Sequence, residues 1–470
     1  MAKVIFWFRQ DLRCYDNIGL IEAARAGQVL PIYIHDETIH DYKIGKASRW
    51  WLNNSLHKLN EKLGGKLNFY KGSSKDIILR LIKEQQIDAV YWNRRYEPAH
   101  IKQDSAIKEL LGHMGIACKT FNSSLLREPW EVKKQDGSMY KVFTPYWQKG
   151  YLQEAIPRLP QPAPTNLNLL SDINSLKLEA LGLLPVISWH NKLEKYWECG
   201  EDAGQEKLKD FLENGLCGYK EGRNAPAKQN VSRLSPYLHF GEISINQLWH
   251  CVNAEKINNI LNENDINHFL MELVWREFSY YILYHFPKLP HENFQAKFDK
   301  FQWQVDDKAL RAWQKGQTGY PIIDAAMREL WETGYMHNRM RMVVGSFLIK
   351  NLLLHWHHGA DWFWDCLLDA DLASNSFNWQ WVAGSGTDAA PYFRVFNPVL
   401  QGEKFDPDGS YTRKFVPELR NLPNAYLFKP WEAKKHILEE AGIVLGKNYP
   451  HPMVDLNDSR KRALDVYSSL

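Results

Sequence analysis

Residues 369–388, near the C-terminal end of the chain, combine large rings with hydrogen-bonding side chains. Trp379 and Trp381 lie within thirteen residues of two aspartates and two asparagines, and a turn of Gly, Ser and Thr follows. Tryptophan is costly to leave in water and usually packs against other groups. A planar ligand with polar edges suits this mixture, and so does a buried loop whose Asn and Asp side chains are satisfied. The composition alone leaves both interpretations open.

A second stretch, residues 231–238, reads Val-Ser-Arg-Leu-Ser-Pro-Tyr-Leu and predicts the start of a helix with Pro236 near its first position. The hydroxyls of Ser232 and Ser235 beside free N–H groups are typical of a phosphate site. A simple helix cap is the commoner use of the same pattern. Upstream, Arg223 is either a phosphate or base contact or a solvated loop charge.

Two further predicted helices carry groups that could bind a nucleobase or a phosphate. Spacing of i, i+3 and i+4 puts Glu272, Trp275 and Arg276 on one face, where a carboxylate could bond the edge of a stacked base. A surface Glu–Arg pair beside a core Trp is the alternative. On the second helix Asn338, Arg341 and Met342 share a face and Arg339 lies at its side, which suits base and phosphate contacts. A capping Asn with two surface arginines is the alternative there, and His337 is expected to be structural.

The elements that must position these side chains change character along the chain. Residues 1–130 alternate short apolar runs with helical patterns, which predicts a doubly wound parallel α/β domain (Rossmann-like) without a GxGxxG motif. The predicted strands are Val4–Phe8, Val29–His35, Lys66–Tyr70, Asp88–Trp92 and Ala117–Phe121. The predicted helices between them are Ile18–Ala26, Ser48–Leu63, Lys75–Gln85 and Ile101–Met114.

A proline-rich segment, Pro157–Pro164, cannot be a helix or a central strand, so residues 131–195 are predicted to be an interdomain linker. Residues 196–470 are predicted to form a helical domain. Its predicted helices are Gly204–Asn214, Ile245–Val252, Asp265–Tyr284, Asp307–Lys315, Tyr320–Thr333, Asn338–Leu354 and Asp361–Leu368.

The bulk composition excludes several classes of protein. A chain of 470 residues is expected to form two or three domains. The sequence contains no run of 18 or more apolar residues, so a membrane span is not indicated. Six scattered cysteines without a CxxC pair fit reduced thiols in the cytoplasm and give no metal signature. The net charge of +3 means that any nucleic-acid site must be a local basic patch. Nineteen tryptophans, twelve of them after residue 195, fit a helical core, stacking platforms or redox relays.

Several long motifs resemble the photolyase/cryptochrome family, and the resemblance covers essentially the whole chain. It is most similar to class I cyclobutane pyrimidine dimer photolyases. The matching motifs are Trp7–Arg13, Trp275–Phe278, Thr318–Met327, Met336–Arg339, Asn378–Arg394 and Tyr449–Asp455. Trp381 argues against the DASH branch, where Tyr is typical, and Asn375 against plant cryptochromes, where Asp is typical. In (6-4) photolyases and animal cryptochromes histidines occupy the region of His337–Arg339. These comparisons favour DNA repair, with a cryptochrome-type blue-light receptor as the alternative.

The resemblance implies that the helical domain binds FAD in its reduced form, FADH⁻. Asp369, Asp371 and Asn375 would contact the flavin, and Arg341 would pair with the first aspartate. A neutral amide at Asn375 tolerates an anionic flavin better than a carboxylate does. The residues that match the phosphate-binding stretch are Tyr219, Val231, Ser232, Arg233, Leu234 and Ser235; Val231 departs from the usual Thr.

The resemblance also implies a relay of tryptophans and a lesion-binding cavity. Trp303, Trp356 and Trp379 match an electron chain to the flavin, although three core tryptophans would leave the same pattern. The cavity would be lined by Glu272, Trp275, Asn338, Met342 and Trp381, with Arg223 and Arg339 toward the DNA backbone. Base flipping is a general property of photolyases. Light would drive an electron from FADH⁻ to the flipped-out dimer and back, and Glu272 would stabilise the dimer anion.

A second chromophore is expected in the α/β domain. Relatives use methenyltetrahydrofolate, a deazaflavin or a second flavin, of which the first two are the leading candidates, and an empty site is the alternative. The segment Asn93–Pro98 and the loop after residue 35 are its expected contacts. The expected substrate is UV-damaged DNA, and the expected state is a cytoplasmic monomer without a bound metal or a membrane.

Overall fold

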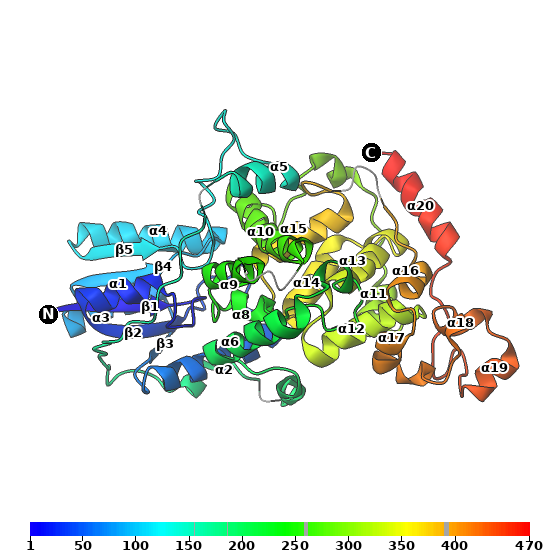
Figure 1. The fold of residues 1–470 in the computed structure, drawn as a ribbon, viewed down its shortest axis with the longest axis horizontal. Helices are drawn as coiled ribbons and strands as arrows, with labels where there is room; N and C mark the ends of the chain where they lie inside the picture. Colours follow the sequence, from blue (N-terminus) through cyan, green and yellow to red (C-terminus); the bar gives the residue numbers. More distant parts are fainter. Residues whose placement is uncertain (155, 186, 258–261, 390–393) are drawn as a thin grey trace. The chain divides into compact units, whose positions relative to one another are not determined.

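The computed structural model describes residues 1–470 except 155, 186, 258–261 and 390–393. Two compact units make up the chain (Figure 1). Unit 1 contains Met1–Cys217, Ser232–Pro287 and Asp371–Ala373, and unit 2 contains Gly218–Val231, Lys288–Ala370 and Ser374–Leu470. Each unit is therefore built from segments that are distant in sequence. The domain boundaries predicted at residues 130 and 195 stay a prediction.

Unit 1 begins with a five-stranded parallel sheet whose strand order is β3-β2-β1-β4-β5 (Figure 1). This order confirms the predicted doubly wound fold, because the chain reverses direction beside β1. Each strand lies within two residues of its predicted bounds. The strands are β1 (Ala2–Phe8), β2 (Gly27–His35), β3 (Asn68–Lys71), β4 (Ala89–Asn93) and β5 (Ala117–Phe121).

Both faces of the sheet are covered by helices. Successive side chains of β1 point to opposite faces and are buried on both, so each face must be covered. Ile5 and Trp7 pack in a core with residues of α3 (Ser74–Gln85) and α4 (Pro98–His113). Between them, Phe6 meets α1 (Ile18–Ala26), which contacts four of the strands. A Cβ on Gly19 would lie 2.7 Å from the Phe6 ring, so this helix approaches the sheet closely where it has no side chain.

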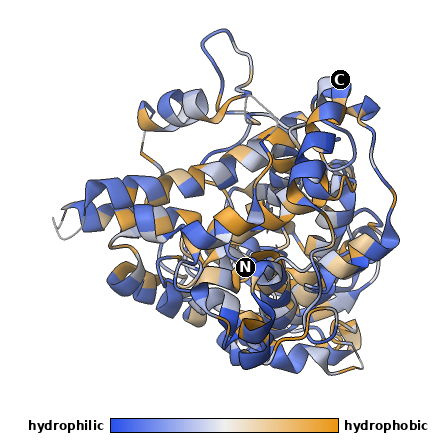
Figure 2. Cartoon of the chain, turned by 90° about the vertical axis from the view of Figure 1, so that its right-hand side faces the viewer, coloured by the Kyte–Doolittle hydropathy of each residue, from blue (hydrophilic) through white to orange (hydrophobic). Residues whose placement is uncertain are grey.

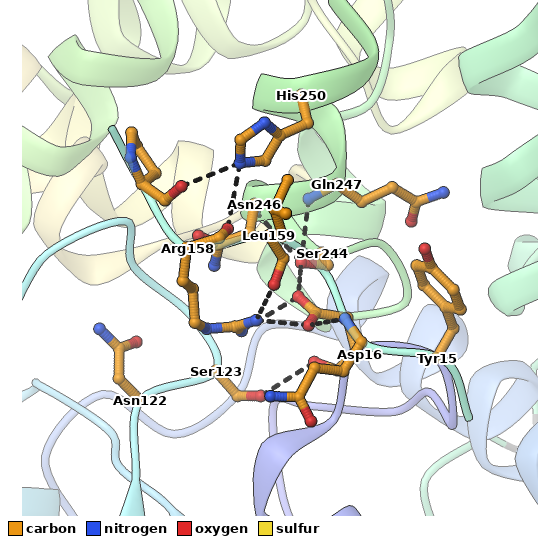
Figure 3. Close-up of polar contacts among 12 residues, drawn as sticks. Tyr15, Asp16, Asn122, Ser123, Arg158, Leu159, Ser244, Asn246, Gln247 and His250 are labelled. Atoms are coloured by element: carbon orange, nitrogen blue, oxygen red, sulfur yellow. Dashed lines mark hydrogen bonds and ion pairs between the residues drawn. The ribbon is translucent and has the colours of Figure 1, made fainter. Parts of the chain in front are cut away.

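The proline-rich segment in the middle of the predicted linker is held by a fully buried carboxylate of unit 1, Asp16 (Figure 3). Asp16 accepts two bonds from Arg158, at 2.5 and 3.0 Å, one from Gln161 N at 2.8 Å, and one from the Ser244 hydroxyl. His250 Nε2 lies 2.9 Å from the Pro157 carbonyl and 3.1 Å from that of Arg158. The proline-rich segment is therefore ordered by hydrogen bonds and an ion pair instead of by secondary structure.

Helices follow in unit 1, and a second buried carboxylate joins them to α2 (Lys46–Lys62). Glu242 accepts bonds from Trp51 Nε1 at 2.8 Å, from Gly200 N at 2.6 Å and from the Ser55 hydroxyl. The helices are α5 (Phe143–Trp147), α6 (Glu201–Asp210), α8 (Ser235–His239), α9 (Ile245–Ile257) and α10 (Glu263–His285).

Unit 2 is helical and has one large aromatic and aliphatic core. The long helix predicted over residues 338–354 ends earlier than expected, because α13 passes into a π-helical turn at Phe347–Asn351. The helices are α7 (Tyr219–Gly222), α11 (Asp307–Gln314), α12 (Pro321–Thr333), α13 (Asn338–Ser346), α14 (Trp356–Cys366), α15 (Leu372–Ala383), α16 (Pro398–Phe405), α17 (Ser410–Phe415), α18 (Asn424–Leu427), α19 (Lys435–Glu440) and α20 (Leu456–Ser468).

The prediction that residues 369–388 form a loop was wrong for most of the stretch, because α15 spans Leu372–Ala383. Asn378 Nδ2 donates to the Ser374 carbonyl one turn earlier, at 2.8 Å, which is compatible with the helix. Hydrophilic and hydrophobic residues are mixed along the helices (Figure 2). Among the described residues, no helix is both long and apolar enough to cross a membrane.

Candidate functional site

In unit 1 the predicted base-binding face of α10 is present, and a residue absent from the sequence-based prediction supports it. Glu272 and Trp275 are half-buried on this face. The Trp275 ring stacks on Phe143 with ring centroids 3.5 Å apart and an interplanar angle of 7°. Stacking on one side fixes the orientation of the indole. A ring at Phe143, 132 residues earlier in the chain, gives no spacing signal that could have indicated this contact.

Arg276 does not form the surface pair that was weighed for it, because it points to a buried group. Its Nη1 donates to the Ser124 carbonyl at 2.9 Å, and its guanidinium lies 4.9 Å from the Tyr280 ring centroid. Tyr280 in turn donates its hydroxyl to Asp371, and His239 Nδ1 is 3.6 Å from the same carboxylate. Burial raises the pKa of Asp371, but His239, the charge of Arg276 and the bond from Tyr280 bring it below its ordinary value. Asp371 is therefore a buried anion that is bonded to Tyr280 and lies near two basic side chains.

The predicted phosphate-binding stretch of unit 1 is a short turn before α8. The Ser232 hydroxyl accepts from Leu234 N at 3.4 Å, and Arg233 has a left-handed φ of 53°. The Arg233 guanidinium lies 6.0 Å from the Trp197 ring centroid, and Ser235 is exposed. The Ser232 bond stabilises the turn before α8 and is not a helix cap, because the cap residue of α8 is Leu234 and no side chain caps it.

In unit 2 the predicted ion pair of Arg341 and Asp369 is present. Arg341 Nη2 lies 2.8 and 3.1 Å from the two carboxylate oxygens, and its Nε donates to the Met336 carbonyl at 2.8 Å. Burial lowers the pKa of Arg341, but Asp369 raises it above its ordinary value. Asn375, half-buried on α15, donates Nδ2 to the Ala360 carbonyl at 3.1 Å and keeps its side-chain oxygen for another group.

Three arginines of unit 2 form a basic cluster: Arg223, Arg339 and Arg394. Burial lowers the pKa of Arg339, and the charges of Arg223 and Arg394 lower it further. Arg339 is held by a bond from Nη2 to Asn224 Oδ1, and its guanidinium lies 4.6 Å from the Phe405 ring centroid. Like charges held close together favour a bound anion. Arg394 was absent from the predicted set because it belongs to a different segment of the chain.

The start of α13 differs from the alternative that made Asn338 its cap. His337 is the cap, and its Nδ1 accepts from Arg339 N at 3.2 Å, so its expected structural role is confirmed. Asn338 is the first helical residue and is exposed. Met342 is half-buried one turn later, with its sulfur 3.9 Å from Arg339 Nη1.

The tryptophans of the predicted relay all belong to unit 2. Trp379 and Trp356 are buried and Trp303 is half-buried. A Cβ on Gly359 of α14 would lie 2.1 Å from the Trp379 ring, so only glycine allows this indole to lie against the helix that begins at Trp356. Trp381 is half-buried and donates Nε1 to the Asp388 carbonyl at 3.1 Å. Residues 390–393 of the same motif lie outside the described residues.

The segments predicted to contact a second chromophore meet at the carboxyl ends of β1, β2 and β4. They form a group that we name the strand-end cluster: Trp7, Arg9, His35, Asp36, Arg49, Arg95 and Gln103. Gln103 Nε2 donates to Asp36 at 2.7 Å, and Arg95 reaches Gln103 Oε1 at 3.3 Å. The Arg95 guanidinium lies 5.9 Å from the Trp7 ring centroid.

Several donors of the strand-end cluster have no hydrogen-bond partner within the described part of the chain. They are Trp7 Nε1 and the Nε atoms of Arg9, Arg49 and Arg95, and all four are buried. Burial and the charge of Arg9 lower the pKa of Arg95 to about 10, and burial lowers the pKa of His35. Buried donors are normally satisfied. A ligand with acceptor atoms and negative charge would satisfy these. Among the described residues, no group of three or more His, Cys, Asp or Glu could hold a metal ion.

Two family models match the chain. The model described as DNA photolyase matches residues 4–165, and the model described as the FAD binding domain of DNA photolyase matches residues 269–469.

Curated relatives are similar over the full length. A deoxyribodipyrimidine photo-lyase from Agrobacterium fabrum is 46% identical, with 100% of this chain and 98% of that protein covered. Cryptochrome-1 from Arabidopsis thaliana is 36% identical, with 99% of this chain and 70% of that protein covered.

Solved structures are similar as well. A bacterial class III photolyase from Agrobacterium tumefaciens has a TM-score of 0.96 at 46% identity and covers 100% and 98% of the two chains. An archaeal photolyase from Sulfolobus tokodaii, described with two FAD molecules, has a TM-score of 0.84 at 29% identity and covers both chains fully.

Proposed function

Because the chain belongs to the DNA photolyase and cryptochrome family, we propose that it is a photolyase that repairs cyclobutane pyrimidine dimers in UV-damaged DNA with blue light. The observation that carries the proposal is the full-length similarity to a deoxyribodipyrimidine photo-lyase, together with the predicted acid and indole on one face of α10. The protein is further proposed to act as a cytoplasmic monomer. Its six scattered cysteines support the compartment.

FAD in its reduced form, when bound, supplies the electron that light drives to the dimer. The charge pattern of the chain fits this group. Asp369 is neutralised by Arg341, and Asp371 is held by Tyr280 and His239, so both carboxylates have fixed positions and can accept bonds from a ring edge. Asn375 offers a neutral amide in place of a third acid. Residues 231–235 and Tyr219 are proposed to hold the phosphates.

Residues of both units are proposed to bind the DNA. The basic cluster of Arg223, Arg339 and Arg394 has the charge to contact phosphates, and the like-charge repulsion within it would be relieved by an anion. Trp275, fixed by Phe143, would stack against the flipped-out dimer, and Glu272 would bond its polar edge. Asn338, Met342 and Trp381 are proposed to complete the lining.

The strand-end cluster is proposed to hold the second chromophore. Its unsatisfied donors and excess of arginine favour a molecule that carries carboxylates or other acceptors. Methenyltetrahydrofolate has such groups, and a deazaflavin has a ring edge with acceptors. An absorption spectrum of the purified protein distinguishes the two, because each adds its own band to those of flavin.

The class and the alternative function need separate tests. The similar solved structure is named a class III photolyase, and the assignment of this chain to class I stays a prediction. Similarity to Cryptochrome-1 keeps a blue-light receptor as the second candidate. A receptor would form a stable light-induced state that changes the binding of a protein partner, without repairing DNA.

The central test illuminates the reduced, purified protein with dimer-containing DNA. We expect blue light to restore intact pyrimidines and the dark reaction to restore none. Equal restoration in the dark, or none in the light with FAD bound, would contradict the proposal.

A substitution at Glu272 tests its assigned role. In Glu272→Ala we expect repair yield to fall more than DNA affinity does, because the carboxylate would act mainly on the dimer anion. Glu263→Ala, at the exposed first turn of the same helix, is the matched control and should change neither quantity. A Glu272→Ala yield equal to that of Glu263→Ala would remove Glu272 from the mechanism.

A further inference from the structure

An imidazole lies against both outer tryptophans of the proposed relay. The His355 ring centroid is 5.0 Å from that of Trp303, at an interplanar angle of 66°. It is 5.6 Å from that of Trp356, at an angle of 27°. Trp356 belongs to the proposed relay, and its neighbour His355 has no role in the proposed function. We propose that His355 is a positioning residue for the relay, whose neutral ring keeps the contact region of Trp303 and Trp356 free of positive charge while an electron crosses it.

The hydrogen bonding of His355 fixes which of its nitrogens carries the proton. His355 is the cap of α14, and its Nδ1 accepts from His357 N at 3.2 Å. An accepting Nδ1 in a neutral imidazole requires the proton on Nε2. Protonation of Nδ1 would remove the cap and place a cation at the positive end of a helix. Both effects oppose the charged form.

The neighbours of His355 oppose its protonation as well. Burial, followed by the charges of His357 and His358, lowers the pKa of His355 to about 4. These two bases lie on its own helix. Across from it lies the uncharged indole of Trp303. The ring centroids of Trp303 and Phe301 are 4.3 Å apart. The His357 ring, with Asp361 and His291 acting on it, lies 3.8 Å from Trp356 and 4.6 Å from His355. Near neutral pH the two indoles are thus in contact with an uncharged imidazole.

Charge at this position matters because the relay carries a positive charge outward. With oxidised flavin bound, Trp379 would give up an electron to it, Trp356 would refill Trp379, and Trp303 would refill Trp356. The oxidised indole left at Trp303 loses its proton to solvent or takes an electron from an added thiol. A cation about 5 Å from the Trp303 and Trp356 rings would repel the oxidised state of each, and the repulsion at this distance is strong enough to change a population about tenfold or more. This inference rests on the proposed function, because it needs the flavin and the relay.

The experiment compares four proteins loaded with oxidised FAD and a thiol: wild type, His355→Asn, His355→Lys and His358→Lys. The measured quantity is the quantum yield of flavin photoreduction, which is the number of flavins reduced per photon of blue light absorbed. Asn can cap the helix without a charge, so His355→Asn should stay within about threefold of wild type. In His355→Lys the yield of flavin photoreduction should be lower by about tenfold or more. His358→Lys places the same charge at an exposed site of the same helix turn and should stay near wild type.

Two readouts separate a charge effect from loss of structure and from failure of the proposed function. Indole fluorescence of the flavin-free proteins should show a quenching step on acidification toward pH 4 in wild type that His355→Asn lacks, because an imidazolium quenches a ring that it touches. Any step from His357, whose ring lies 3.8 Å from that of Trp356, is common to both proteins. Repair by chemically reduced wild type tests the proposed function without the relay. The inference would be overturned, and the proposed function would stand, if wild type repairs DNA and its flavin is photoreduced no faster than that of His355→Lys. Equal fluorescence curves in wild type and His355→Asn would also overturn the inference. This outcome can be observed even in a protein that binds no flavin.

Discussion

Two buried polar groups of unit 1 differ in how completely their hydrogen bonds are satisfied. Around Asp16, four donors converge on one carboxylate (Figure 3). The aspartate carbonyl also accepts from Arg13 Nη2 at 2.9 Å. In the strand-end cluster, four buried donors have no partner among the described residues. A satisfied buried ion holds a fold together, and an unsatisfied one is retained for a ligand. Consecutive residues show the same contrast, because Arg94 is paired with Glu128, whereas the Nε of Arg95 has no partner among the described residues.

Removal of the Asp16 carboxylate should have the largest effect on stability. In Asp16→Ala the buried ends of Arg158 and Ser244 lose their acceptor, and alanine is less suited than aspartate to the left-handed φ of 50°. Breaking a buried ion pair costs about 3–5 kcal/mol. The free energy of unfolding in urea measures the loss. Asp202→Ala, at an aspartate that pairs with Lys62 on the surface, is the control and should lose less than about 1 kcal/mol. Equal losses in the two variants would mean that the Asp16 cluster does not hold the fold.

Glu242 should make stability depend on pH, because its partners are neutral donors and not a cation. Burial raises the pKa of Glu242 to about 7, against an ordinary value near 4.5. The folded protein therefore binds more protons than the unfolded chain between these values, and stability falls as pH rises from about 4.5 to 7. The loss is on the order of 3 kcal/mol. Glu242→Gln should flatten this part of the curve of unfolding free energy against pH. An unchanged slope in the variant would assign the pH dependence to other groups, such as Glu277.

Arg94→Met is expected to be moderately destabilising. Arg94 donates to Glu128 from Nε at 3.0 Å and from Nη2, and to the Thr120 carbonyl from Nη1 at 2.7 Å. Its loss leaves the buried Glu128 carboxylate with the Tyr96 hydroxyl, at 2.9 Å, as its remaining side-chain donor among the described residues. Because Glu128 keeps the Tyr96 hydroxyl as a donor and the substitution does not fall on a left-handed residue, we expect a loss of about 2 kcal/mol, below that expected for Asp16→Ala. Urea unfolding checks the value, and a loss as large as that of Asp16→Ala would remove the distinction between the two sites.

Sequence patterns predicted the elements well where one physical rule decides them. The strand bounds were predicted to within two residues. β1, β2 and β4 are short apolar runs buried on both faces, which favours a strand, and the edge strand β5 is short and partly exposed. Helix α15 was missed because Asn375, Ser376 and Asn378 favour turns in isolation, and packing of Trp379 against Gly359 overrides that preference. Pro157–Pro164 was assigned correctly as irregular, but nothing in its sequence indicates Asp16 as its partner.

Site residues could be predicted where they share one motif and not where distant segments supply the partner. Arg341 and Asp369 were paired from the family resemblance, and their contact is confirmed. Tyr280 lies one helical turn after Arg276, and this spacing could have indicated its place beside Asp371. Phe143 gave no such signal, because its contact with Trp275 is made only by the tertiary fold. Arg394 ends the motif Asn378–Arg394, but nothing in that motif indicates that its charge acts on Arg339.

Arg95→Met should have the smallest effect on stability and the clearest effect on the second chromophore. The arginine lies among cations, its pKa is lowered to about 10 by burial and by Arg9, and its Nε has no partner among the described residues. Replacement of such a group by an apolar side chain is neutral or stabilising, so we expect a change within about 1 kcal/mol. The absorption band of the second chromophore should be lost, while the flavin bands remain. Arg94→Met is the matched control, one residue away, with the opposite expectation of lower stability. A destabilised Arg95→Met that keeps the extra band would mean that the strand-end cluster stabilises the fold and does not bind a ligand.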